Sequence, residues 1–270
     1  MVEDGSRDLD RVQRAIEEQE FARGHVPPGT PAVDPRPAAT VCLARPAGGG
    51  FEVLLLQRPL ASRFAAGAHV FPGGTIDPED RSSEALDRLS SCAFESMTVR
   101  AALFAGFREA FEETGLLLAS EGVDPDALGQ VRNSRTALLE GSVTFARLLE
   151  RSGVMLDAAS AVYFARWITP VELDRRYDTM FFMARHPGGT PEITHEHTAF
   201  VWMEPAEALD RFRAGLLPML FPTRMTLELL RRFDRLDEVF VAFREREVKP
   251  ILARLIIEEG RIRPAPVELK

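Results

Sequence analysis

The chain has 270 residues, of which 45% are hydrophobic and 27% charged, and its net charge is −8. This balance excludes an intrinsically disordered protein, and the negative charge argues against general nucleic-acid binding, which depends on Lys and Arg contacts to phosphates. No apolar run approaches the ~20 residues that span a bilayer, so we expect no membrane association. Two cysteines exclude a disulfide framework, and the acidic start lacks the blocks of a secretion signal, so we expect a cytoplasmic protein.

Apolar periodicity predicts strands that alternate with helices along the chain. A charged helix is expected at 7–21, before an irregular arm rich in Pro and Gly. The predicted strands are an antiparallel pair at 37–45 and 51–58, then 161–169, 180–185 and 197–203. The predicted helices are 98–115, most of 124–152, 205–215 and 222–247, and the last twenty residues predict a hairpin that turns at Glu259-Gly260.

This order of elements predicts an α/β layered fold with a mixed sheet. We divide the chain into an N-terminal helix and irregular arm (1–36), a main domain (37–235) and a helical and hairpin C-terminal extension (236–270). The polar, serine-rich segment at about 81–97 interrupts the main domain and reads as an inserted surface loop. Such a loop is tolerated because the entropy cost of closure grows only logarithmically with length.

The helix predicted at 98–115 is the most informative segment. Three carboxylates share one face of its helical wheel: Glu109, Glu112 and Glu113. Three phenylalanines occupy the opposite face: Phe104, Phe107 and Phe111. Three small residues predict open space beside the acids: Ala102, Ala105 and Gly106. The acidic face is either solvated or lines a cleft. In a cleft each repulsion at ~4 Å rises to roughly 4 kcal/mol at a dielectric constant near 20, so the carboxylates need a cation such as Mg²⁺.

The letters around these acids resemble the Nudix box. Residues 108–116, REAFEETGL, match its second half, Arg-Glu-U-x-Glu-Glu-x-Gly-U with U aliphatic, and Gly74 with Asp80 resembles its first half. The chain departs from the pattern in three ways. Asp80 replaces the usual Glu, and Ala110 fills a position that normally holds a larger aliphatic residue. The twenty-seven residues 81–107 stand where the pattern has seven. The insertion of about twenty residues puts the role of Asp80 in doubt.

The resemblance implies a Nudix α/β/α sandwich and a divalent-metal-dependent phosphoanhydride hydrolase. Glu109, Glu112, Glu113 and the carbonyl of Gly74 would hold Mg²⁺ or Mn²⁺, with the three glutamates also catalytic. Arg108 would mainly orient a carboxylate, most simply Glu112 one turn later. A homodimer is expected by analogy, since many Nudix proteins pair.

A second motif precedes the box. Arg58, Arg63, Gly67 and the run Phe71-Pro72-Gly73-Gly74 resemble the coenzyme A signature of one Nudix branch, although Leu56 and Pro59 depart from it. Arginine forks suit the phosphates of coenzyme A, so Arg58 and Arg63 would bind substrate with Gly67; the alternative is that both arginines form surface ion pairs.

The implied reaction is hydrolysis of coenzyme A or an acyl-coenzyme A to 3′,5′-ADP and (acyl-)4′-phosphopantetheine. The long insertion and the run at 175–182 also resemble acyl-coenzyme A diphosphatases. Two alternatives stay open: a pyrophosphatase acting on ADP-ribose, nucleotide sugars or dinucleotides, and a non-catalytic module that senses a nucleotide.

Further candidates lie near residue 196. Glu196 precedes Trp202 by six residues, where many Nudix proteins place an additional acid, so it is a candidate base or metal-water ligand against a plain turn residue. Zinc binding by His195 and His197 is not favoured, because no further ligands stand at a suitable spacing.

Overall fold

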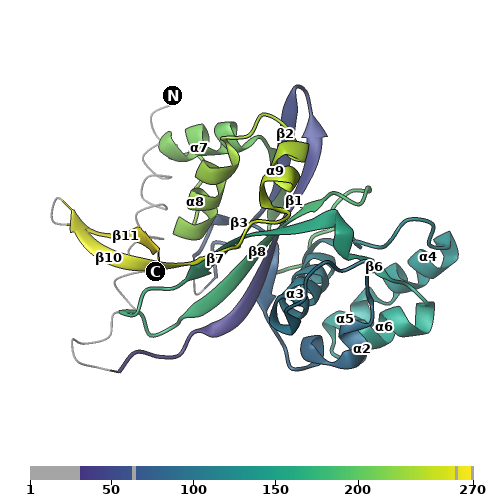
Figure 1. Cartoon of the computed structure of the whole chain (residues 1–270). Helices are drawn as coiled ribbons and strands as arrows, with labels where there is room; N and C mark the ends of the chain where they lie inside the picture. Colours follow the sequence, from purple (N-terminus) through teal and green to yellow (C-terminus); the bar gives the residue numbers. More distant parts are fainter. Residues whose placement is uncertain (1–30, 63–64, 259–260, 269–270) are drawn as a thin grey trace.

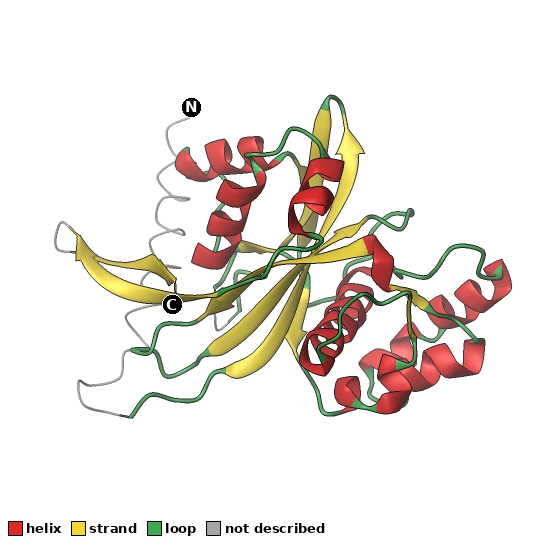
Figure 2. Cartoon of the chain, in the orientation of Figure 1, coloured by secondary structure: helices red, strands yellow, loops and turns green. Residues whose placement is uncertain are grey.

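The computed structural model describes residues 31–62, 65–258 and 261–268, with the backbone alone for 255–258 and 261–268. The helix predicted at 7–21 and the predicted site residue Arg63 lie outside the described residues. Within these ranges a mixed sheet carries helices on both faces, which confirms the predicted α/β class (Figure 1, Figure 2). Every helix there is too short or too polar to pass through a bilayer.

The main sheet of the described residues holds nine strands in the order β11-β10-β7-β8-β1-β2-β3, with β4 paired to β1 and β9 to β2. Their bounds are β1 (Arg36–Ala47), β2 (Gly50–Gln57), β3 (His69–Val70), β4 (Gly73–Thr75), β7 (Ala161–Ile168), β8 (Tyr177–Arg185), β9 (Ala199–Met203), β10 (Pro250–Glu258) and β11 (Arg261–Glu268). β1 is parallel to β8 and β10 to β7, whereas the other pairs are antiparallel. The predicted strand pair and the C-terminal hairpin are therefore confirmed as β1-β2 and β10-β11.

Strand β1 lies in the middle of the sheet, and its sequence explains why. Val41 and Leu43 belong to the core on one face, while Cys42 and Ala44 belong to the core on the other. Side chains alternate between faces along a strand, so an unbroken apolar run fits a strand that is covered on both sides.

Two helical layers cover these faces. One contains α2 (Ser83–Leu86), α3 (Met97–Thr114), α4 (Pro125–Asn133), α5 (Arg135–Leu139) and α6 (Phe145–Ser152). The other contains α7 (Pro205–Arg213), α8 (Phe221–Leu230) and α9 (Leu236–Phe243). Short 3₁₀ turns η1 (Glu79–Arg81) and η2 (Ala158–Ser160) and a separate parallel pair, β5 (Leu89–Ser90) with β6 (Leu156–Asp157), complete the order.

Local signals set both ends of α3. The side chain of Ser96 accepts a hydrogen bond from the N–H of Val99, and Gly115 ends the helix at φ +70°, a conformation that favours glycine. The predicted phenyl face is confirmed as core: Phe104 and Phe111 each pack against Phe145 of α6, with ring centroids 5.5 and 5.6 Å apart.

The prediction of open space beside the acids is wrong. Ala102 and Ala105 are fully buried, and a Cβ at Gly106 would come within 2.7 Å of a Val41 methyl group on β1. The small residues bring α3 close to the sheet, so they reduce the space on that side of the helix instead of enlarging it.

The inserted segment at 81–97 is also more ordered than the predicted surface loop. It contains α2 and β5, and Ala85, Leu86 and Leu89 are buried in the core that α3 shares. The carbonyl of Leu86 accepts a hydrogen bond from Arg100 of α3 at 3.1 Å. The insertion therefore folds against the helix that it precedes.

The helix predicted at 222–247 is two helices, α8 and α9. Leu230 and Leu236 are both buried, and a five-residue turn between them lets each helix reach the same core. The carboxylate of Glu238 accepts the backbone N–H groups of Asp234 and Arg235, which stabilises the start of α9.

Candidate functional site

The structure brings the two halves of the Gly-and-Glu motif together. Strand β4 places Gly73 and Gly74 beside the last turns of α3, where the N–H of Gly73 donates to Oε2 of Glu113 at 3.1 Å. At Gly74 a Cβ would overlap the carboxylate of Glu109, so only glycine allows this close approach. The residues between the halves do not separate them in space.

Arg108 connects the same two pieces. Its Nε and Nη2 donate to both carboxylate oxygens of Asp80 at 3.0 and 2.9 Å, and Nη2 also donates to the carbonyl of Thr75 at 3.0 Å. Its Nη1 donates to Glu109 and Glu112 at 3.0 and 2.9 Å. The predicted contact with Glu112 is present, and Asp80, whose role was in doubt, is the buried partner of this guanidinium.

The acidic trio, defined as Glu109, Glu112 and Glu113, is partly or largely withdrawn from water. Burial raises the pKa of Glu109 to about 7, against the lowering effect of Arg108, and neighbouring Glu112 raises it further. Burial also raises the pKa of Glu112, and it raises the pKa of Glu113 well above its ordinary value, with a further contribution from Glu109. Desolvated like charges favour a bound cation over three ionised acids alone.

A small cavity of about 270 Å³ is lined by the trio, Glu196 and Thr194, with two leucines of α5 on its wall. Within the described ranges, no three His, Cys, Asp or Glu side chains already form a metal-site cluster. Arg108 supplies the nearest positive charge to two members of the trio and holds their carboxylates by hydrogen bonds. The acidic trio offers carboxylate oxygens, which suit Mg²⁺ or Mn²⁺ and do not suit metals that prefer thiolate.

His197 is a neighbour of the trio that sequence reasoning did not assign to the site. Its buried Nε2 lies 3.8 Å from Oε1 of Glu113, and neither ring nitrogen has a hydrogen-bond partner among the described residues. Burial, together with the charge of Arg58, lowers the pKa of His197 to about 4, so its imidazole is neutral at pH 7. Residues 195–196 form a turn and not a strand, and no spacing rule marks such a contact.

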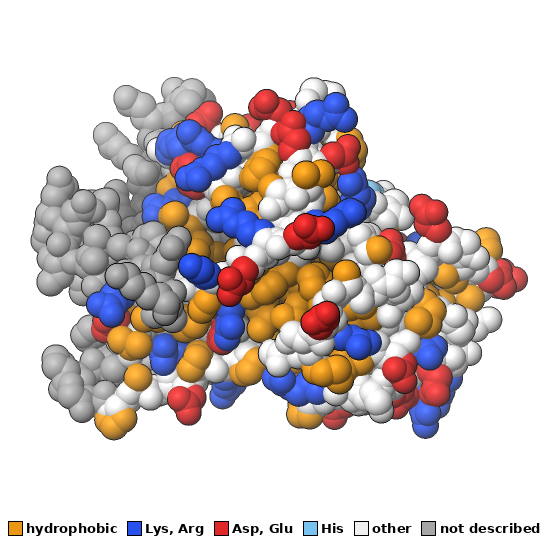
Figure 3. All heavy atoms as spheres, viewed as in Figure 1, with side chains coloured by type: hydrophobic (Ala, Val, Ile, Leu, Met, Phe, Trp, Pro, Cys, Tyr) orange, Lys and Arg blue, Asp and Glu red, His pale blue; other side chains and the backbone are white. Residues whose placement is uncertain are grey.

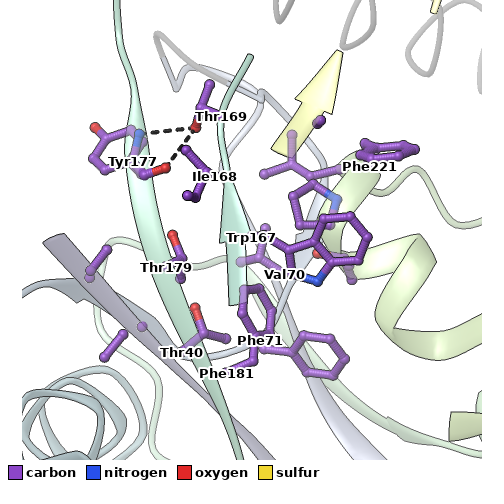
Figure 4. Close-up of a pocket in the computed structure, with 18 of the residues that line it drawn as sticks. Thr40, Val70, Phe71, Trp167, Ile168, Thr169, Tyr177, Thr179, Phe181 and Phe221 are labelled. Carbon is purple, nitrogen blue, oxygen red and sulfur yellow. Dashed lines mark hydrogen bonds between the residues drawn. The ribbon is translucent and has the colours of Figure 1, made fainter. Parts of the chain in front are cut away.

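A large cavity of about 710 Å³, part of which Figure 4 shows, shares Glu113 with the small cavity. Glu113, Gly73, Gly74 and Arg58 contribute to its lining, and the cavity continues between the sheet and the start of α8. Its size falls within the range of small-molecule sites. Glu113, the glycine pair and the guanidinium of Arg58 therefore line one ligand-sized space, while Glu109 and Glu112 line the small cavity that shares Glu113.

The residues of the second motif differ in their positions. Arg58 lines the large cavity, and its charge acts on Glu113. Gly67 adopts φ +75° in a buried turn, beyond the lining of both cavities, and the neighbouring Ala68 accepts the backbone N–H of Arg58. Gly67 thus shapes the loop that carries Arg58, while Arg63 is outside the described residues.

The sequence and the fold of this chain are similar to those of known proteins. Residues 95–229, half of the chain, match the family model described as the NUDT19 Nudix domain. The acyl-coenzyme A diphosphatase NUDT19 of Gallus gallus is 29% identical over 76% of this chain and 70% of its own length; that of Homo sapiens is 27% identical over 72% and 64%. A solved NUDIX hydrolase from Alicyclobacillus acidocaldarius is 27% identical, with a TM-score of 0.63, and the match covers 77% of this chain and 96% of that one.

Proposed function

The chain belongs to the Nudix hydrolase family, within the branch of the NUDT19 Nudix domain, and we propose that it hydrolyses the diphosphate of coenzyme A or an acyl-coenzyme A. The products would be 3′,5′-ADP and (acyl-)4′-phosphopantetheine. One observation carries the proposal: Glu113 of the acidic trio, the glycine pair and Arg58 line a cavity large enough for this substrate, and Glu113 also lines the small cavity that holds Glu109 and Glu112. The names of the curated relatives support the same reaction.

The acidic trio and the carbonyl of Gly74 would hold Mg²⁺ or Mn²⁺. Such an ion, when bound, lowers the pKa of a coordinated water and neutralises charge on the diphosphate. Arg108 positions Glu109 and Glu112 through its hydrogen bonds, and the N–H of Gly73 positions Glu113. These contacts fix the carboxylates before substrate binds, which is the contribution of the protein to phosphoryl transfer.

Substrate contacts would come from the second motif. Arg58 lines the large cavity, where it can bind phosphate oxygens as a two-pronged donor. We propose the same role for Arg63, and a loop-shaping role for Gly67 that keeps Arg58 in place. A coenzyme A enzyme of this kind prefers its substrate over dephospho-coenzyme A, which lacks the 3′-phosphate.

The test is product analysis by mass spectrometry with Mg²⁺ or Mn²⁺ and a panel of coenzyme A, dephospho-coenzyme A and ADP-ribose. Glu113→Gln should lower kcat/KM for coenzyme A by at least about a hundredfold, because the divalent ion that neutralises the diphosphate loses one charged ligand. Glu121→Gln changes an exposed loop glutamate and serves as the matched control. EDTA should abolish turnover.

Three results would overturn the proposal in different ways. Full activity of Glu113→Gln would remove the metal site. Turnover of ADP-ribose with coenzyme A intact would favour the broader pyrophosphatase. Nucleotide binding without any metal-dependent turnover would favour a sensing module.

A cytoplasmic location and a homodimer remain predictions from the sequence. Light scattering on the eluting peak of a gel-filtration column measures the mass of the particle and tests the predicted homodimer directly.

A further inference from the structure

The large cavity extends from Glu113 of the acidic trio to an apolar end formed mainly by Trp167, Phe181 and Phe221. We propose that this end binds the thiol terminus of the pantetheine arm and the acyl chain attached to it. The inference rests on the proposed hydrolysis of coenzyme A and adds where the uncharged half of the substrate lies.

The order of the strands in the sheet determines the order in which they line the cavity. Gly73 is on β4, which pairs with β1; β1 pairs with β8, β8 with β7 and β7 with β10. Thr40 on β1 is opposite both Gly73 and Phe181, and Thr179 on β8 is opposite Trp167. At about 4.8 Å per strand, β7 lies about 14 Å and β10 about 19 Å from β4. The cavity therefore runs across the strands, away from the acids.

The pantetheine arm matches this path in length. It spans about thirteen bonds from phosphorus to sulfur, or about 15 Å when extended at the ~3.4 Å per three bonds of a polypeptide chain. An arm whose phosphate lies beside Glu113 and Arg58 brings its sulfur to β7, where Trp167 lines the cavity. An acyl chain continues toward β10, where Ala253 lines it.

The chemistry of the walls changes along the same path. Thr40 on β1 and Thr179 on β8 lie part of the way along (Figure 4), where their hydroxyls suit the two amides of the arm. Phe181 on the same strand, and Trp167 and Phe221 farther along, add aromatic side chains that carry no charge. The buried Nε1–H of Trp167 has no acceptor among the described residues, and a thioester carbonyl beside it gives this donor a partner.

The other half of coenzyme A fits the apolar end poorly. Its adenosine carries a 3′-phosphate, and a charged phosphate among uncharged walls loses its hydration without compensation. Of the arginines that line the cavity, Arg58 acts on Glu113, and Arg175 is exposed on the loop between β7 and β8, where its neighbour Asp174 adds a negative charge that disfavours a phosphate. The uncharged arm is the half that these walls suit.

The two tryptophans of the chain provide a direct test. Trp202 does not line the large cavity; it is on β9, with the guanidinium carbon of Arg45 4.5 Å from its ring centroid. Trp202→Phe leaves Trp167 as the one indole, and Trp167→Phe leaves Trp202. Both variants are titrated with dodecanoyl-coenzyme A, coenzyme A and 3′,5′-ADP in EDTA, which prevents turnover, while tryptophan emission is recorded.

Dodecanoyl-coenzyme A should change the emission of Trp167 saturably, coenzyme A should change it less, and 3′,5′-ADP should leave it unchanged. The emission of Trp202 should stay constant throughout. An equal response of Trp167 to 3′,5′-ADP would place adenosine at the apolar end and overturn the inference. A Trp202→Phe protein that hydrolyses dodecanoyl-coenzyme A with a silent Trp167 would also overturn it, and would leave the proposed function standing. Absence of both binding and hydrolysis would remove both proposals.

A kinetic ratio gives a second readout that partial misfolding does not change. Phe221→Ala should lower kcat/KM for dodecanoyl-coenzyme A relative to coenzyme A by roughly tenfold, because the acyl chain loses one apolar wall. Phe200→Ala removes a half-exposed phenyl group on β9 and should keep the wild-type ratio. A ratio that is the same in both variants would contradict an acyl site at Phe221.

Discussion

Replacing Asp80 by alanine breaks a buried ion pair and tests whether this residue joins the two halves of the Nudix box. The carboxylate is 2% exposed and accepts two hydrogen bonds from Arg108, at 3.0 and 2.9 Å. Loss of one partner from a buried pair costs about 3–5 kcal/mol of unfolding free energy. Because the guanidinium keeps two glutamates and one carbonyl as partners, we expect the lower end, about 3 kcal/mol.

A double-mutant cycle of Asp80→Ala and Arg108→Ala isolates the pair. Denaturation with guanidinium chloride is followed both by circular dichroism and by tryptophan emission. If the two probes report the same transition, unfolding is two-state and gives the unfolding free energy of each variant. The coupling energy should be about 2–3 kcal/mol. Arg166 and Asp178 form the control, since their two hydrogen bonds of 2.7 and 2.6 Å have similar geometry but lie nearer to water. Their cycle should give less than about 1 kcal/mol.

Equal coupling energies in the two cycles would refute the reasoning. They would mean that the burial of Asp80 adds nothing to its contact with Arg108, so the first half of the box would be held by the glycine contacts alone.

Three glycine substitutions test the packing around α3 and the acids. Gly106→Ala places a methyl group 2.7 Å from a Val41 methyl and should lower the unfolding free energy by about 1–3 kcal/mol. Gly129 is in α4 with open space around it, so Gly129→Ala should raise the unfolding free energy by about 0.5–1 kcal/mol. Chemical denaturation of both variants measures the two changes. A change of the same sign in both variants would contradict the close contact at Gly106. Gly74→Ala should displace the flexible carboxylate of Glu109, which lowers Mg²⁺-dependent activity about tenfold or more with little change in the unfolding free energy. If the variant keeps wild-type activity over a Mg²⁺ titration, the contact between Gly74 and Glu109 has no catalytic value.

Some of this architecture is predictable because its signals are local. Ser96 and Gly115 mark the ends of α3 by capping chemistry that depends only on neighbouring residues. The helical wheel likewise predicts that Phe104 and Phe111 share a buried face, because the period of a helix is fixed. Within this family the letters of the box then predict which acids meet, although about twenty extra residues separate its halves.

Other features depend on which element packs against which. The helical wheel shows that Gly106 lies near the acids, but it does not show that β1 packs against this residue. A small residue is compatible both with open space and with close packing, so the sequence does not distinguish the two. The break between Leu230 and Leu236 follows from the need of both residues to reach one core. The contact of His197 with Glu113, and a cavity wall shared by β1, β7, β8, β10 and α8, unite segments far apart in the sequence.

The position of the insertion explains why it leaves the site assembled. The segment leaves the box after Asp80 and returns at Ser96, and both flanks are held: Asp80 by Arg108, and the start of α3 by its cap. Between these points its apolar residues pack into the core on the α3 face, whereas the large cavity continues on the opposite face, beneath α8. Because closure cost depends weakly on length, and the inserted chain buries its own apolar residues, it adds mass to one layer without entering the large cavity.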